Sequence, residues 1–125
     1  MYYPCFRAVL FVRCWYADTF NVRSAHAPDR MPIPPALLRH RVGEDLDPDR
    51  FLAVGERASQ NIQSALTQID RRFGDFHSIL DFGRGCGRTL SWLAPQFPEA
   101  KFHGTDVDTE AIDGAARICP SRPGK

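Results

Sequence analysis

The central part of the chain shows a helical pattern of apolar and polar positions. In residues 48–73 apolar side chains recur every three or four positions, which predicts one long helix with an apolar face. Asp47 and Pro48 suit its N-cap and first position, and Gly74 suits its C-terminal stop. The apolar positions are Phe51, Val54, Ala58, Ile62, Ala65, Ile69 and Phe73.

Two short apolar runs follow this helix and predict strands at 77–82 and 100–105. Because the first run is flanked by turn signals, we expect that strand to be buried on both faces. A helix at 88–94 joins the two strands, and another helix begins near Asp108. This order of elements predicts an α/β fold, a Rossmann-like doubly wound parallel sheet.

The chain contains the first two strands of such a sheet with their flanking helices. Residues 119–125 form a short tail with two prolines and a glycine, which is too short for further strands. We therefore expect an incomplete domain over 48–118. Its uncovered sheet edges favour self-association.

The residues before the long helix divide into two segments. Residues 31–47 are a proline-rich linker and turn, in which 36–42 forms a short helix or turn ended by Gly43. Residues 1–30 are an aromatic-rich extension of unclear structure. Within it, 7–16 is compatible with either a strand or a short helix.

Composition narrows the function classes only slightly. Of the 125 residues, 43% are hydrophobic and 25% charged, which is typical of a soluble globular protein. A net charge of +1 gives no indication of a nucleic-acid partner. No apolar run approaches the ~18 residues of a membrane span, so we expect no membrane contact and a cytoplasmic location. The four cysteines form no CxxC pair, and no metal site is predicted.

Three alternating glycines, Gly83, Gly85 and Gly87, follow Asp81 between the first predicted strand and the next helix. Glycine permits positive φ and a close approach of a ligand to the backbone. The dinucleotide pattern G-x-G-x-x-G fails because Arg88 stands in the third glycine position, and no Gly-Lys-Ser/Thr ending marks a P-loop. Open α/β sheets bind ligands at such loops, so we expect a nucleoside-bearing cofactor here.

Residues 79–88, with an acid followed by G-x-G-x-G, resemble the first motif of class I S-adenosylmethionine-dependent methyltransferases. Residues 103–108 resemble their second motif, in which an acid, here Asp106, ends the second strand. The second acid follows the first by 25 residues, and the proline-rich stretch upstream is also similar to a subgroup of these enzymes. The resemblance covers roughly residues 31–117. It implies the cofactor-binding portion of a methyltransferase with an unidentified methyl acceptor.

The resemblance also implies roles for the motif residues. The three glycines let the backbone approach the methionine and ribose of S-adenosylmethionine. Asp81 anchors the loop and attracts the amino or sulfonium side, Asp106 accepts hydrogen bonds from the ribose hydroxyls, and Val107 packs against adenine. No catalytic residue is assigned, because acceptor-positioning residues of this fold normally lie beyond the second helix. The expected cofactor-binding residues are Asp81, Gly83, Arg84, Gly85, Gly87, Asp106 and Val107.

Other interpretations stay open at this point. The chain is also compatible with a noncatalytic Rossmann-like binding module or remnant. A nucleotide-binding half of an oxidoreductase is disfavoured by Arg88 in the loop. Cys86 is compatible with a reactive thiol near a helix N-terminus or with a simple spacer.

Arg84 departs from the family motif, in which this position is usually small or Cys. It brings a cation near a cofactor that is itself a sulfonium cation, and two such charges repel by about 1 kcal/mol in water and more where solvent is excluded. We therefore expect Arg84→Cys to tighten the binding of S-adenosylmethionine in calorimetric titrations. Equal or weaker binding by the variant would contradict this expectation.

Overall fold

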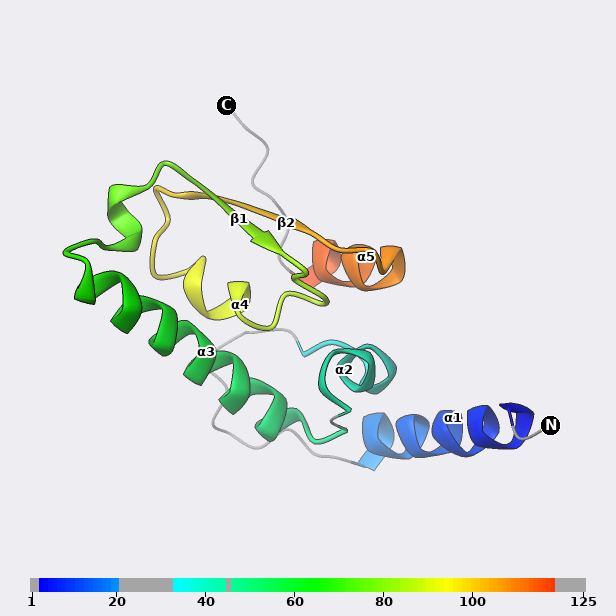
Figure 1. Cartoon of the computed structure of the whole chain (residues 1–125). Helices are drawn as coiled ribbons and strands as arrows, with labels where there is room; N and C mark the ends of the chain where they lie inside the picture. Colours follow the sequence, from blue (N-terminus) through cyan, green and yellow to red (C-terminus); the bar gives the residue numbers. More distant parts are fainter. Residues whose placement is uncertain (1–2, 21–32, 45, 119–125) are drawn as a thin grey trace.

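The computed structural model describes residues 3–20, 33–44 and 46–118 (Figure 1). The predicted tail 119–125 and parts of the predicted segments 1–30 and 31–47 lie outside these residues. Along the described residues the elements are α1 (Tyr3–Phe20), α2 (Ala36–Gly43), α3 (Pro48–Gln68), the 3-10 helix η1 (Phe73–Asp75), β1 (Ser78–Phe82), α4 (Leu90–Leu93), β2 (Lys101–Thr105) and α5 (Thr109–Ile118).

The two strands form a parallel sheet whose register runs from Ser78 opposite Lys101 to Phe82 opposite Thr105. Helices α3 and α4 lie on one side of this sheet, and α4 lies between the sheet and α3 (Figure 1). The molecule is therefore α/β with a parallel sheet, consistent with an incomplete Rossmann-like fold. Among the described helices, none is both long and apolar enough to cross a membrane.

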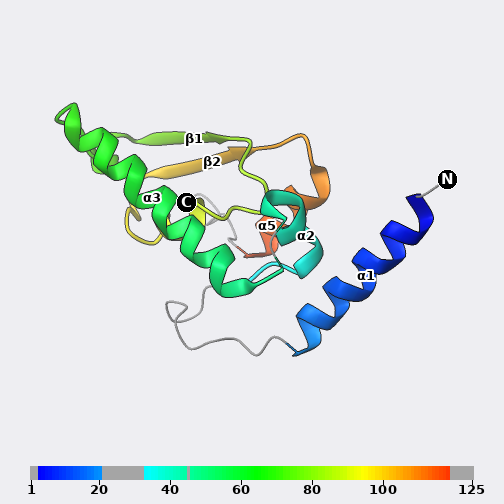
Figure 2. The same cartoon turned by 60° about the horizontal axis from the view of Figure 1, so that its bottom comes forward.

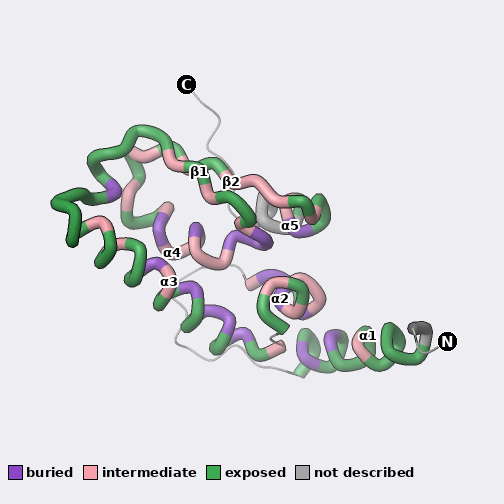
Figure 3. Tube along the Cα trace, viewed as in Figure 1, coloured by how far each residue is buried: buried purple, intermediate pink, exposed green. Residues whose placement is uncertain are grey.

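One face of the sheet is covered and the other is open. Ile79 and Phe102 are register partners on the covered face, where Phe102 contacts the buried Phe73 at 6.3 Å between ring centroids. On the opposite face Leu80 is 63% exposed and Phe82 is 86% exposed. The expectation that this strand is buried on both faces is therefore wrong for the described chain. The run has apolar residues on both faces, but helices cover it from one side (Figure 3).

The long helix ends earlier than predicted, at Gln68. Asp70 adopts φ +54°, its N–H donates to the Thr67 carbonyl at 3.1 Å, and the Arg71 N–H donates to the Leu66 carbonyl at 2.9 Å. These two bonds form a Schellman motif with an acid in the left-handed position that glycine usually takes. Gly74 instead lies in η1, so its prediction as the helix stop is wrong.

The buried face of α3 is also rotated from the predicted stripe. Phe51, Leu52, Gly55 and Ser59 are buried, whereas Ile62 and Ile69 are 42% and 66% exposed. The reason is a close contact at Gly55, where an added Cβ would lie 2.6 Å from the Arg88 carbonyl oxygen and 3.1 Å from Trp92 Cδ1. Glycine lets α3 approach the loop and α4 there, and this contact selects which side faces inward.

The predicted helix at 88–94 is shorter in the structure, because turns occupy the residues before Leu90. Leu90 and Leu93 face inward and are buried. The strands begin one residue later than predicted, at Ser78 and Lys101. The glycine loop therefore extends through residues 88 and 89, which the sequence pattern had assigned to the first turn of this helix.

The N-terminal extension contains a helix, α1, which decides between the two predicted alternatives. Cys14 and Ala17 pack against Ala36 of α2, and the Asp18 carboxylate accepts the Ala36 N–H at 2.9 Å. Asp18 also pairs with the buried Arg39 at 3.5 Å. Helix α1 thus attaches through its C-terminal half and projects away from the sheet (Figure 2).

We expect Gly55→Ala to destabilise the protein by about 1 kcal/mol. Alanine normally gains about 1 kcal/mol over glycine inside a helix, but overpacking against a backbone carbonyl costs about 1–3 kcal/mol. Urea denaturation followed by tryptophan fluorescence measures the difference. Gly74→Ala is the matched control, because an added Cβ there meets nothing within 4 Å. A stabilised Gly55→Ala variant would show that the contact is not tight.

Candidate functional site

The glycine loop leaves the end of β1 and folds back over the end of β2. Gly83, Gly85 and Gly87 have φ values of +74°, +54° and +80°, a region that other residues rarely adopt. The Thr105 carbonyl accepts hydrogen bonds from the Gly83 N–H at 2.8 Å and the Arg84 N–H at 3.2 Å. The loop is thus joined to the second strand at its carboxyl end, where the second motif begins.

Asp106 joins the two motifs. Its Oδ2 accepts the Gly85 N–H at 2.7 Å, and its Oδ1 accepts the Asp108 N–H at 2.9 Å. These bonds hold the pKa of Asp106 below its ordinary value, the Asp108 amide contributing most. The structure therefore brings together the acid and the glycine loop that the sequence singled out separately, at the shared end of both strands.

The loop offers an open side and a filled side. An added Cβ at Gly83 meets nothing within 4 Å, whereas one at Gly85 would lie 2.7 Å from Val42 Cγ2 of α2. Val107, beyond the acid, is 98% exposed. A bound adenosyl group needs bare backbone, a carboxylate with free lone pairs and an apolar platform. The Asp106 carboxylate has about four lone-pair sites, more than its backbone amide donors occupy, so these residues fit that group.

Asp81 is the second-last residue of β1, just before the glycine loop, and its register partner in β2 is Gly104. Burial raises the pKa of Asp81 above its ordinary value. The Arg84 guanidinium lowers this pKa and the Asp106 carboxylate raises it. Asp81, Arg84 and Asp106 therefore interact electrostatically at one end of the sheet.

Helix α2 supplies residues that the sequence analysis did not assign to the site. Arg41 Nη1 donates to the Asp108 carboxylate at 3.2 Å and also pairs with Glu110, which ties α2 to the turn after β2. Val42 packs on the loop at Gly85. Both residues belong to the upstream stretch whose resemblance to a methyltransferase subgroup was noted, and that stretch was the available signal.

Cys86 is 1% exposed and clusters with Phe51 and Leu52 of α3. Burial raises the pKa of its thiol, which disfavours the thiolate that a reactive cysteine needs. This arrangement supports the spacer interpretation over the reactive one. Among the described residues, no group of three or more His, Cys, Asp or Glu side chains could hold a metal ion.

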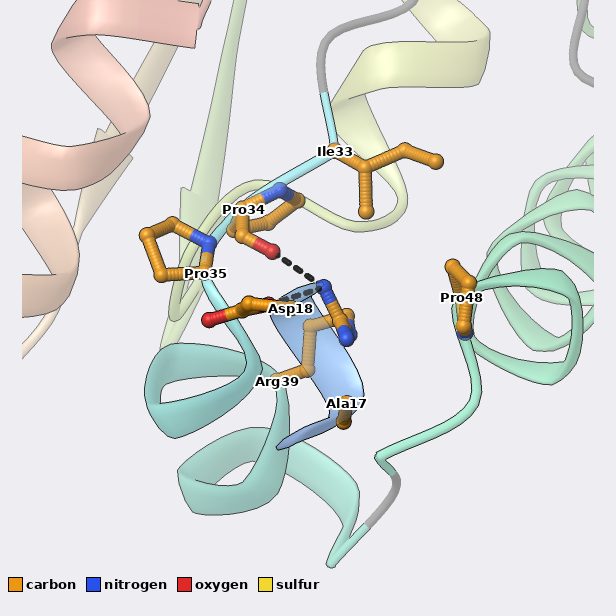
Figure 4. A pocket seen from close by; sticks show the side chains of 7 residues that line it. All are labelled: Ala17, Asp18, Ile33, Pro34, Pro35, Arg39 and Pro48. Carbon is orange, nitrogen blue, oxygen red and sulfur yellow. Dashed lines mark hydrogen bonds and ion pairs between the residues drawn. The ribbon is translucent and has the colours of Figure 1, made fainter. Parts of the chain in front are cut away.

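A pocket of about 200 Å³ lies between α1 and the residues around α2, apart from the glycine loop (Figure 4). Its central side chain is the buried Arg39, whose Nη1 donates to the Pro34 carbonyl at 2.6 Å and whose Nη2 donates to the Leu46 carbonyl at 2.8 Å. Together with its ion pair to Asp18, the Arg39 guanidinium therefore links α1 to the segments on both sides of α2. The pocket contains none of the predicted cofactor-binding residues.

Comparison with known proteins gives one informative similarity. Over 83 residues the chain is 29% identical to trans-aconitate 2-methyltransferase of Pseudomonas paraeruginosa. The matched segment makes up 65% of this chain. The chain spans 30% of that relative's length. No family model and no solved structure matches. The similarity suggests a methyltransferase, in agreement with the resemblance of the two motifs.

The two acids make opposite predictions for stability. An acid whose folded pKa is raised destabilises the protein at pH values above its unfolded value of about 3.9, so Asp81→Asn should increase stability at pH 7. The contribution of Asp106 is present above that value and is lost as pH falls through its lowered folded pKa, so Asp106→Asn should decrease stability at pH 7.

Urea denaturation at pH 7 and at pH 3 measures both differences. The gain from Asp81→Asn should vanish at pH 3, where the carboxyl is protonated in both the folded and unfolded chain. A destabilised Asp81→Asn variant at pH 7 would contradict the burial that we assign to this side chain.

Proposed function

We propose that this chain is the S-adenosylmethionine-binding portion of a class I methyltransferase. The observation that carries the proposal is the hydrogen bond from the Gly85 N–H to the Asp106 carboxylate at 2.7 Å. This bond joins Asp106, the ribose acceptor in this proposal, to the glycine loop, which we propose holds the cofactor. The similarity to a named methyltransferase supports the same reaction class.

The residues of the site have distinct tasks in this proposal. Bound S-adenosylmethionine supplies a methyl group on a sulfonium, which transfers in line to a nucleophile. The Asp106 carboxylate accepts hydrogen bonds from the ribose hydroxyls. The methionine portion lies against the open backbone at Gly83, and the exposed Val107 side chain packs against adenine. Helix α2 closes the back of the loop through Val42 and does not compete for the open side.

The methyl acceptor is not assigned. The relative's name states that it acts on trans-aconitate, but the shared segment covers 30% of that protein. The segment assigned here contains the cofactor loop and the second acid. We propose that acceptor recognition and turnover require groups outside it, and that the chain alone binds cofactor without efficient methyl transfer.

Calorimetric titration with S-adenosylhomocysteine and with NAD separates the candidate functions. We expect S-adenosylhomocysteine to bind and NAD not to bind, and we expect Asp106→Ala to weaken S-adenosylhomocysteine binding at least tenfold. Asp113→Ala is the matched control, because it removes an exposed acid of α5. It should bind like the parent chain.

Binding of NAD in place of S-adenosylhomocysteine would favour the oxidoreductase half. If the chain binds neither ligand, a noncatalytic remnant is the better interpretation. Equal weakening by Asp106→Ala and Asp113→Ala would show that Asp106 does not contact the ligand.

A further inference from the structure

Arg84 belongs to the glycine loop, but its side chain turns onto β2. An added Cβ at Gly104 would overlap Arg84 Cδ and would lie 2.8 Å from both Nε and Nη1. Gly104 does not have a positive φ, so its backbone gives no reason for glycine. The absence of a side chain at 104 is explained by the arginine that occupies that space.

The guanidinium of Arg84 is held in this place without being neutralised by a direct partner. Its Nε is buried and has no hydrogen-bond partner, and among the described residues no carboxylate forms an ion pair with it. By strand alternation Gly104 shares the covered face with Phe102, so the cation lies on the helix side of the sheet. There it acts on both Asp81 and Asp106, whose pKa values it lowers.

We infer that Arg84, seated on Gly104, sets the charge preference of the adenosyl site and favours a neutral thioether over a sulfonium. This inference rests on the proposed function. S-adenosylmethionine and S-adenosylhomocysteine differ by one methyl group and one positive charge on sulfur. Two carboxylates at the strand ends attract that charge, and a fixed guanidinium beside them offsets the attraction.

The ratio of the two dissociation constants measures this preference, because contacts to adenine, ribose and the amino acid portion cancel. Arg84→Met removes the charge and keeps most of the aliphatic chain over Gly104. We expect it to shift the ratio about tenfold toward S-adenosylmethionine, which corresponds to about 1.4 kcal/mol. Calorimetry on the full chain gives both constants for each variant.

Three further variants separate charge from packing. Arg84→Lys keeps the cation and should leave the ratio near that of the parent chain. Arg88→Met removes another loop cation, which lies over the Phe51 ring at 5.7 Å and away from Gly104, and should also leave the ratio unchanged. Arg84→Gln provides a second neutral variant, judged by the same ratio, if circular dichroism shows that Arg84→Met does not fold.

Each outcome decides the inference. A shift in the neutral variants alone supports it. An unchanged ratio in a folded neutral variant overturns it and leaves the proposed function standing, because the chain still binds both ligands. A shift in Arg84→Lys equal to that in Arg84→Met also overturns it, since packing would then explain the effect. If the parent chain and all variants bind neither ligand, the proposed function itself fails.

Discussion

The hydrogen bond between the Gly85 amide and the Asp106 carboxylate connects the two halves of the described site. Two parallel strands end side by side, but their register alone does not determine how the loops beyond them are arranged. The 2.7 Å bond, together with the amides that donate to Thr105, pulls the glycine loop over the end of β2. Because the same carboxylate also accepts the Asp108 N–H, it links the glycine loop to the turn before α5.

Close approaches at glycine repeat through the structure, and each has a different neighbour. Gly55 admits the Arg88 carbonyl, Gly85 admits Val42, and Gly104 admits the side chain of Arg84. Only Gly85 among these three also has a positive φ. Glycines therefore let these segments approach one another as closely as apolar packing does. This is why α2, α3 and α4 lie so near the glycine loop.

The covered and uncovered faces of the sheet have consequences for the site. Phe73 and Phe102 pack on the helix side, and Arg84 shares that side at the carboxyl end. Leu80 and Phe82 on the other side remain exposed. An arginine on the covered face changes the electrostatics of the strand ends without occupying the open backbone at Gly83, so ligand access and ligand charge preference are separate properties of this loop.

The sequence by itself determined the type and order of the long helix, the two strands and the helices that follow them, because the helical spacing in 48–73 and the two short apolar runs follow from local periodicity. The spacing of the three glycines also singled out the loop, and the resemblance to the second methyltransferase motif singled out Asp106. The sequence did not determine that α3 ends at Gln68 or turns Gly55 inward, because both depend on what packs against the helix. The packing of Arg84 on Gly104 and the contact of Val42 with Gly85 join residues from separate elements. Only the tertiary structure decided them, since no spacing along the chain records which side chains meet across a sheet.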